Sequence, residues 1–298
     1  MYLEHFGLEQ APFTITPDTG FFLDHGNHRQ AMNVLLVALQ SGEGFIKVSG
    51  EVGTGKTLLC RKLLNTLDEN FVTAYIPNPC LDPAALHKAL AAELGISFSH
   101  NIGQHRLLQR ITRRLVELNA GNRQVILLLD EAQSMPDDSM EALRLLTNIE
   151  TEQDKLLKVV LFGQPELDHR LQQHHLRQLR QRILFNHTLN PLDRKTTGIY
   201  INHRLLVAGY RGSPLFTAGA LKLLHRNSRG IPRLLNILSH KALMAAYGRG
   251  DRVIKSQHIR TAAADTADSR PRRYRLAMAT ALFGLLTATS AGLFAAWH

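Results

Sequence analysis

Cysteine and tryptophan are scarce in this chain of 298 residues, which has two cysteines and one tryptophan. Neither Cys60 nor Cys80 stands at the spacing of a metal-binding or redox motif. This excludes a disulfide-rich secreted domain and a cysteine-based zinc site, and it suits a reducing compartment. The first residues, Met1–His5, lack the basic and apolar regions of a secretory signal peptide, so we expect no such peptide here.

Acidic residues are scarce in the C-terminal half. Residues 1–160 contain 14 Lys and Arg against 19 Asp and Glu, whereas residues 161–298 contain 21 against 6. The overall charge of +10 therefore resides in the second half, and residues 191–265 alone hold 13 basic against 3 acidic residues. Such a basic half predicts a polyanionic partner, either a nucleic acid or the anionic face of a membrane.

Charge is absent altogether from Leu276–Trp297, a run of 22 residues. As a helix this run would be about 33 Å long, enough to cross a bilayer core of about 30 Å. Four arginines stand directly before it, at positions 270, 272, 273 and 275. By the positive-inside rule we expect a single C-terminal transmembrane helix, with residues 1–275 cytoplasmic. The alternative is an alanine-rich buried helix. The membrane prediction also makes nucleic acid the less favoured partner.

A glycine-rich octapeptide, Gly50–Thr57 (GEVGTGKT), is a complete Walker A motif. Its glycines let the backbone turn tightly and direct successive N–H groups toward phosphate oxygens. Lys56 is expected to reach the β- and γ-phosphates of ATP, and the Thr57 hydroxyl is expected to ligate Mg²⁺. The residues predicted to bind the nucleotide are Gly50, Glu51, Val52, Gly53, Thr54, Gly55, Lys56, Thr57 and Leu58.

Short apolar segments alternate with amphipathic ones, which predicts an α/β fold with a parallel five-stranded sheet. The strands are expected at residues 45–49, 71–76, 125–130, 158–163 and 183–189, and the helices at 58–67, 83–94, 105–119 and 138–149. From 193 to 264 the periodicity is helical throughout. We therefore expect a nucleotide-binding core (1–190), a helical lid (191–265), a basic juxtamembrane linker (266–275) and the transmembrane helix (276–297).

Two acidic residues follow the apolar run Val125–Leu129, which completes a Walker B motif. Asp130 is expected to orient Mg²⁺ through its water shell. Glu131 is expected to polarise the attacking water at the edge of a strand beside the Walker A loop. The two motifs together predict hydrolysis of ATP rather than binding alone.

Six ordered motifs over about residues 1–265 resemble the ExeA/GspA group of AAA+ ATPases. They are Tyr2–Leu8 with Ala11–Phe13 and Thr16–Asp18, Gly42–Phe45 before the Walker A loop, Asp130–Gln133, Gly163–Leu167, Gln181–Ile183 and Gly230–Arg233. The resemblance implies an AAA+ P-loop NTPase core with a helical lid. It also implies ATP and Mg²⁺ as ligands.

The resemblance assigns roles to further polar side chains. Gln164 corresponds to sensor 1, which senses the γ-phosphate, and Arg233 to sensor 2 on the lid. Arg182 corresponds to an arginine finger that reaches the nucleotide of a neighbouring subunit, with Arg180 as a rival on the same segment. These roles imply a ring or filament of identical subunits with ATP at their interfaces.

Within this group the chain resembles short, MshM-type members without a peptidoglycan-binding module. This implies an inner-membrane-associated ATPase that assists assembly of a mannose-sensitive haemagglutinin (MSHA) type IV pilus, with pilus or secretion assembly proteins as partners. One alternative is a general secretion pathway ATPase that aids secretin assembly. Another is a DNA-dependent regulator of the transposition type, which the basic lid favours and the membrane helix disfavours.

Overall fold

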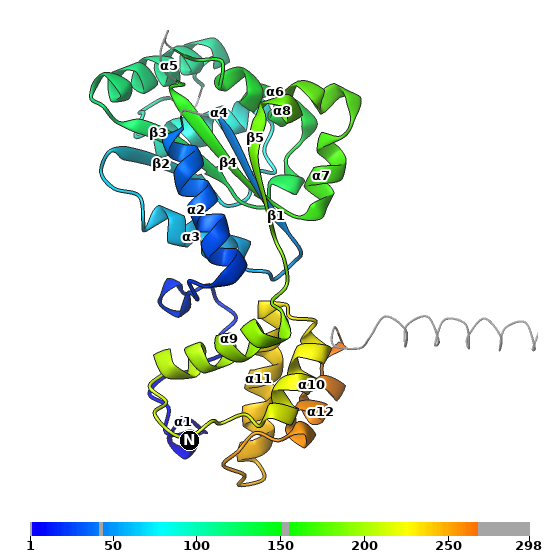
Figure 1. Cartoon of the computed structure of the whole chain (residues 1–298). Helices are drawn as coiled ribbons and strands as arrows, with labels where there is room; N and C mark the ends of the chain where they lie inside the picture. Colours follow the sequence, from blue (N-terminus) through cyan, green and yellow to red (C-terminus); the bar gives the residue numbers. More distant parts are fainter. Residues whose placement is uncertain (1, 42–43, 100, 151–154, 268–298) are drawn as a thin grey trace, which may run out of the picture. The chain divides into compact units, whose positions relative to one another are not determined.

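The computed structural model describes residues 2–41, 44–99, 101–150 and 155–267. By their contacts the residues separate into two compact units. The larger unit is Thr16–Pro191, and the smaller one combines Met1–Ile15 with Leu192 onward. Figure 1 follows the chain through both units.

The larger unit is built around a parallel sheet with the strand order β2-β3-β4-β1-β5. Its strands are β1 (Phe45–Gly50), β2 (Phe71–Ile76), β3 (Gln124–Leu129), β4 (Leu157–Gly163) and β5 (Ile183–Leu189). Each lies within one residue of its predicted bounds. The structure thus confirms the α/β fold and the parallel five-stranded sheet.

Helices cover both faces of this sheet (Figure 1). On one face lie α2 (Gly26–Gln40) and α3 (Lys56–Leu64). On the other lie α4 (Pro83–Glu93), α5 (Gln104–Ala120), α6 (Asp137–Leu146), α7 (Pro165–Leu171) and α8 (Arg177–Arg182). Single 3₁₀ turns occur at Thr19–Phe21, Ala132–Ser134 and His174–Leu176.

The interior strand β3 shows why the sheet forms. Val125 and Leu127 pack into the hydrophobic cluster on one face of the sheet, and Ile126 and Leu128 pack into the cluster on the other. Because successive side chains of a strand point to opposite faces, a strand buried on both sides reads as a continuous apolar run. That run directs the acidic pair Asp130–Glu131 to the carboxyl edge of the sheet.

The smaller unit is helical. It contains α1 (Tyr2–Phe6), α9 (Arg194–Val207), α10 (Ala218–Ser228), α11 (Pro232–Tyr247) and α12 (Ser256–Ala264). In its described part, one isolated parallel bridge joins Phe216 to Ile254. Leucines and isoleucines from α10, α11 and α12 form its buried interior.

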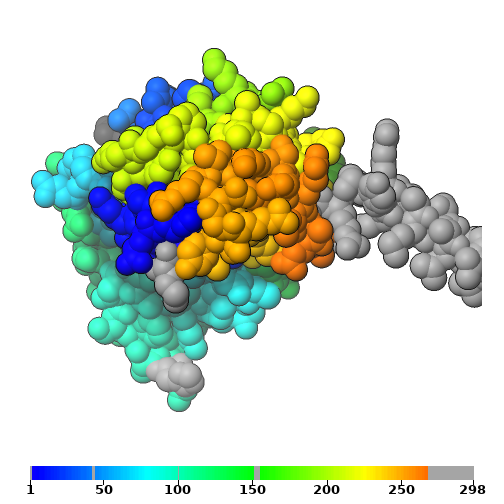
Figure 2. Space-filling view, turned by 90° about the horizontal axis from the view of Figure 1, so that it is seen from below, coloured from blue at the N-terminus to red at the C-terminus, as the bar shows by residue number. Residues whose placement is uncertain are grey.

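The N-terminal segment is an integral part of this unit rather than an appendage. Phe6 and Phe13 are buried, with 5% and 3% of their surface exposed. The Arg204 guanidinium donates to the Pro12 carbonyl, and the Asn236 amide donates to the Thr14 carbonyl at 3.1 Å. Figure 2 shows the first residues, in blue, alongside the orange C-terminal helices.

The predicted transmembrane helix at 276–297, and with it the inner-membrane location, has to be corrected. None of the helices in the described part of the chain combines the length and apolar composition that a bilayer requires. The longest, α5, has 17 residues and carries four arginines, whereas crossing the hydrocarbon takes about 20 predominantly apolar residues. Residues 276–297 lie outside the described residues. The described fold is therefore an α/β core and a helical unit, without a membrane span.

Candidate functional site

The Walker A residues form a loop between the carboxyl end of β1 and the first turn of α3. Gly53 and Gly55 have left-handed backbones, with φ of 82° and 101°, a conformation that favours glycine. At Gly50 space is the constraint, since a Cβ would lie 2.8 Å from the Leu189 carbonyl oxygen. The loop can therefore bring backbone N–H groups close to an anion at a helix N-terminus.

The Lys56 ammonium is held inside this loop. Its Nζ donates to the carbonyl oxygens of Gly50, at 2.7 Å, and Glu51, at 3.1 Å. Burial lowers the pKa of Lys56, and the nearby carboxylates of Glu131 and Asp130 oppose that shift. The ammonium is thus positioned where a bound phosphate would replace carbonyl partners with charged ones.

Thr57 and Asp130 meet at the same edge of the sheet. The Thr57 hydroxyl donates to Oδ2 of Asp130 at 2.6 Å. Asp130 is 2% exposed, and burial raises its pKa although the bond from Thr57 opposes this. Mg²⁺ prefers oxygen ligands and keeps several waters beside one or two protein groups and substrate phosphates. A hydroxyl and a carboxylate next to a phosphate-binding loop fit that ion.

Glu131 is held by two amides. Its carboxylate accepts hydrogen bonds from the side chains of Gln133 and Gln164, the latter at 2.9 Å. The Gln164 backbone N–H in turn donates to Oε1 of Gln133 at 2.9 Å. Glu131 also has a left-handed backbone, with φ of 53°, which is uncommon for a residue with a side chain. The carboxylate is therefore fixed in orientation beside the Walker A loop.

Gln164 lies directly after β4, as the sensor 1 role requires, and Gln133 joins it as a partner of Glu131 that the site prediction omitted. The signal was available, because Gln133 stands within the motif Asp130–Gln133. What the sequence did not show is that its side chain turns back to bridge two strand ends.

His28 on α2 is a second residue that the sequence interpretation missed. Its Nε2 lies 2.9 Å from the Thr54 carbonyl oxygen, and the residue is 8% exposed. Burial lowers the pKa of His28, with a smaller contribution in the same direction from His187. The Nε2–H therefore donates to the loop in the neutral form. A Cβ at Gly55 would lie 3.0 Å from Nε2, so His28 packs directly against the Walker A loop and supports it.

Arg182 lies at the opposite edge of the sheet. It ends α8 at the amino end of β5, and its guanidinium donates to the Arg144 carbonyl at 3.3 Å and the Thr147 hydroxyl at 3.2 Å. β5 pairs in parallel with β1, so about six residues, or about 20 Å of strand, separate this end from the Walker A loop. Arg182 is therefore too far away to serve its own Walker A loop.

Arg180, the rival of Arg182, is exposed. Among the described residues it has no hydrogen-bond or ion-pair partner. Arg233 is also exposed and is the second residue of α11 in the smaller unit. Its sensor 2 role stays a prediction.

Known proteins agree with this geometry. Residues 39–171 match a family model described as AAA domain. The chain is 42% identical over 270 residues to General secretion pathway protein A of Aeromonas hydrophila. That alignment covers 91% of this chain and 49% of the relative, so the chain spans about half the relative's length.

Two solved structures show the same fold at low identity. Cdc6p from Pyrobaculum aerophilum superposes with a TM-score of 0.63 at 18% identity, covering 83% of this chain and 70% of that one. ORC1 of Aeropyrum pernix, solved in complex with DNA, superposes with a TM-score of 0.61 at 20% identity, covering 86% of this chain and 69% of that one. With the P loop described above, these matches support an AAA-type P-loop fold over residues 39–171, and 91% of the chain is similar in sequence to General secretion pathway protein A.

Proposed function

We propose that the chain binds and hydrolyses ATP, with Glu131 as the general base. The observation that carries this proposal is the fixed position of the Glu131 carboxylate. It accepts hydrogen bonds from the side-chain amides of Gln133 and Gln164, the second at 2.9 Å. A catalytic base has to be oriented toward the water it activates. The two amide donors fix the orientation of the carboxylate.

The other Walker residues supply binding. Backbone N–H groups of the loop and the Lys56 ammonium bind the phosphates, and Thr57 and Asp130 would hold Mg²⁺. When bound, that ion neutralises charge on the β- and γ-phosphates. Glu131 then accepts a proton from the attacking water.

We infer that Arg182 or Arg180 completes the site of a neighbouring subunit. The position of both residues at the edge opposite the Walker A loop supports action in trans. A ring or filament of subunits would place that edge against the next subunit's nucleotide, where an arginine stabilises the charge of the transition state.

Release of phosphate by the purified chain, measured with and without Mg²⁺, tests the proposed activity. Lys56→Ala is the control, because it removes the ammonium that the loop carbonyls hold. We expect at least about 100-fold weaker ATP binding in this variant, from the loss of charge-assisted hydrogen bonds. Mg²⁺-dependent release that is equal in both proteins would contradict the proposal.

We propose that in the cell the chain is an accessory ATPase that assists assembly of an MSHA-type pilus. The 42% identity to General secretion pathway protein A supports a secretion-related role, and a general secretion function, with secretin assembly as its readout, is the alternative. Deletion of the gene, complemented with the wild type or Lys56→Ala, separates the two. Loss of surface pili with normal secretion supports the pilus role, and the reverse result contradicts it.

A further inference from the structure

The smaller unit carries a basic groove along α10. We use this name for a cavity of about 560 Å³ bounded by α9, α10 and α12. Its cations are Arg194, Lys222, Arg226, Arg229 and Arg260. Gly219, near the start of α10, and Arg229, directly after its end, both line the cavity. At 1.5 Å per residue the groove therefore follows about 15 Å of this helix.

The positive charge of the groove is not cancelled by neighbouring acids, since none of its lining residues is acidic. Residues 192–267 contain three acidic residues. Asp193 interacts electrostatically with the lining residue His225, and its carboxylate is held at the start of α9 by the Thr196 N–H at 2.6 Å. The other two pair with residues outside the lining. Asp251 pairs with Lys255 and His258, and Asp265 pairs with Lys241.

Four of the five cations, in contrast, have no acidic partner in the described part of the chain. Lys222, Arg226 and Arg260 are exposed and form no ion pair with any described residue; the same holds for Arg194. Exposed, unpaired guanidinium groups in a row attract an anion that extends along the row.

The walls of the groove are fixed before any ligand binds. The start of α10 is tied to the start of α12, because the Thr217 N–H donates to the Ile254 carbonyl at 3.0 Å and the Ile254 N–H to the Leu215 carbonyl at 2.8 Å. Gly219 lies so close to Ser256 that a Cβ would be 3.1 Å from its Oγ. A groove with preformed walls loses little entropy on binding.

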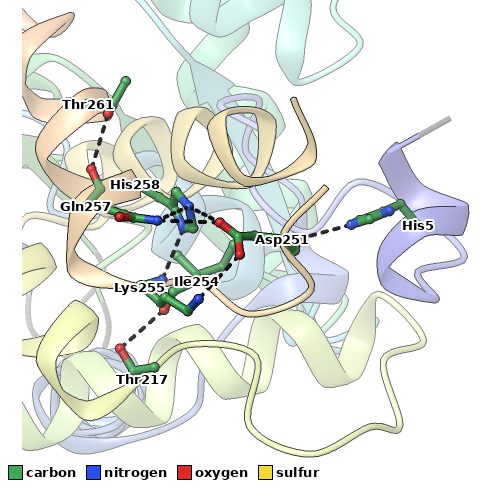
Figure 3. Close-up of polar contacts among 8 residues, drawn as sticks. All are labelled: His5, Thr217, Asp251, Ile254, Lys255, Gln257, His258 and Thr261. Carbon is green, nitrogen blue, oxygen red and sulfur yellow. Dashed lines mark hydrogen bonds and ion pairs between the residues drawn. The ribbon is translucent and has the colours of Figure 1, made fainter. Parts of the chain in front are cut away.

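A buried histidine sets the first turn of α12. The Lys255 N–H donates to Nδ1 of His258 at 3.1 Å, so Nε2 carries the proton and donates to Asp251 at 3.0 Å. Figure 3 shows this chain of contacts, with His5 bound to the Asp251 carbonyl on the far side. The turn that presents Ser256 and Arg260 is therefore held from within the unit.

We propose that the basic groove binds the phosphate backbone of a duplex nucleic acid without reading its base sequence. Guanidinium groups match phosphate oxygens in geometry as well as charge. The lining contains no Phe, Tyr or Trp, and its one ring, that of His225, is hydrogen-bonded to the Thr197 hydroxyl at 3.0 Å. The groove therefore offers little surface on which single-stranded bases would stack. Leu223 is its one large apolar residue, which leaves few contacts for an acidic peptide. This partner differs from the sequence expectation, which disfavoured nucleic acid because of the predicted membrane helix.

The test is binding of the full chain to a fluorescently labelled duplex of arbitrary sequence, followed by anisotropy across a series of salt concentrations. One phosphate contact from each of the four unpaired cations, Arg194, Lys222, Arg226 and Arg260, predicts a slope of about −3.6 for log K against log salt, since each contributes about −0.9. Arg226→Glu is expected to weaken binding at least about tenfold and to make the slope shallower by about one.

Arg249→Glu is the matched control, since it makes the same change of charge at an exposed residue outside the groove. Binding of this control should stay within about twofold of the wild type. Equal loss in both variants, or equally tight binding of a poly-glutamate peptide of matched charge, would overturn the proposal. Lys222→Glu repeats the test if Arg226→Glu melts at a lower temperature than the wild type. ATP hydrolysis is measured on the same proteins and should not change. A failure of the nucleic-acid proposal is therefore distinguishable from a failure of the proposed ATPase activity.

Discussion

The two edges of the sheet present opposite kinds of surface. At the carboxyl edge the polar side chains bind one another: Thr57 bonds to Asp130, and Glu131 accepts from Gln164. At the amino edge the Arg182 guanidinium donates to Arg144 and Thr147 at the end of α6, and Arg180 is exposed and without a partner among the described residues. The carboxyl edge gathers the residues proposed to bind and hydrolyse ATP, whereas in the described chain the amino edge presents arginines with no such residues beside them. The difference suggests that each edge is completed by the opposite edge of another copy.

Removal of the arginine finger is expected to give the largest effect on turnover. If Arg182 is the finger, Arg182→Ala should lower the ATP turnover of the assembled protein by about 1,000-fold, because such a finger stabilises the charge of the transition state. ATP affinity should not change. Steady-state rates over a range of protein concentrations measure this, with Arg177→Ala on the same helix α8 as the control.

If Arg182→Ala leaves the ATP turnover unchanged and Arg180→Ala lowers it strongly, Arg180 is the arginine finger. Unchanged rates in both variants, or a wild-type rate per subunit that does not rise with protein concentration, would remove the trans finger from the account.

Loss of an amide at the carboxyl edge should have a smaller effect. Gln133→Ala removes one donor to the Glu131 carboxylate and the acceptor of the Gln164 N–H. We expect about tenfold slower turnover, because a hydrogen bond to a charged group is worth about 1.5 kcal/mol or more. This loss should be the same at all protein concentrations, since both partners belong to one subunit. Gln30→Ala, at an exposed position on α2, is the control.

The contact of His28 with the Walker A loop should affect the stability of the folded chain. His28→Gln disrupts the bond to the Thr54 carbonyl, and a melting temperature lower by about 2–4 °C is expected for the loss of one buried hydrogen bond. Differential scanning fluorimetry measures this, with His25→Gln as the exposed control.

The stabilising contribution of His28 should depend on pH. Burial lowers the pKa of His28 in the folded chain. As the pH falls below about 6.5, the unfolded chain therefore takes up a proton before the folded one does. The contribution of His28 is complete above that pH and is lost below it. The difference in melting temperature between wild type and variant should narrow toward acid; a difference that widens would contradict the role of His28.

The strands could be predicted because each is specified locally. A run such as Val125–Leu129 can only be buried on both faces, and the acidic pair after it marks the strand end. Contacts that depend on the folded chain could not be predicted. His28 and Thr54 are 26 residues apart, and no spacing rule connects them.

Two further features depend on long-range packing in the same way. The first residues belong to the smaller unit through contacts such as Glu9 with Ala208, although sequence order placed them with the core. In β1, Lys47 is buried and pairs with Asp168 on α7, an ion pair that the apolar pattern of the strand does not suggest. The membrane helix was inferred from composition alone, and none of the helices in the described part of the chain is long and apolar enough to span a membrane.

The central claim is that one ATP site is built from two edges of two subunits, and mixing two inactive variants tests it most directly. Glu131→Gln retains the arginines but lacks the base, so its turnover should fall by at least about 100-fold with ATP binding retained. Arg182→Ala retains the base but lacks the finger. When the two proteins are mixed, interfaces that combine an intact Glu131 with an intact Arg182 should form, and ATP hydrolysis should rise well above that of either variant alone. No recovery on mixing, under conditions in which the wild type hydrolyses ATP, would contradict the account.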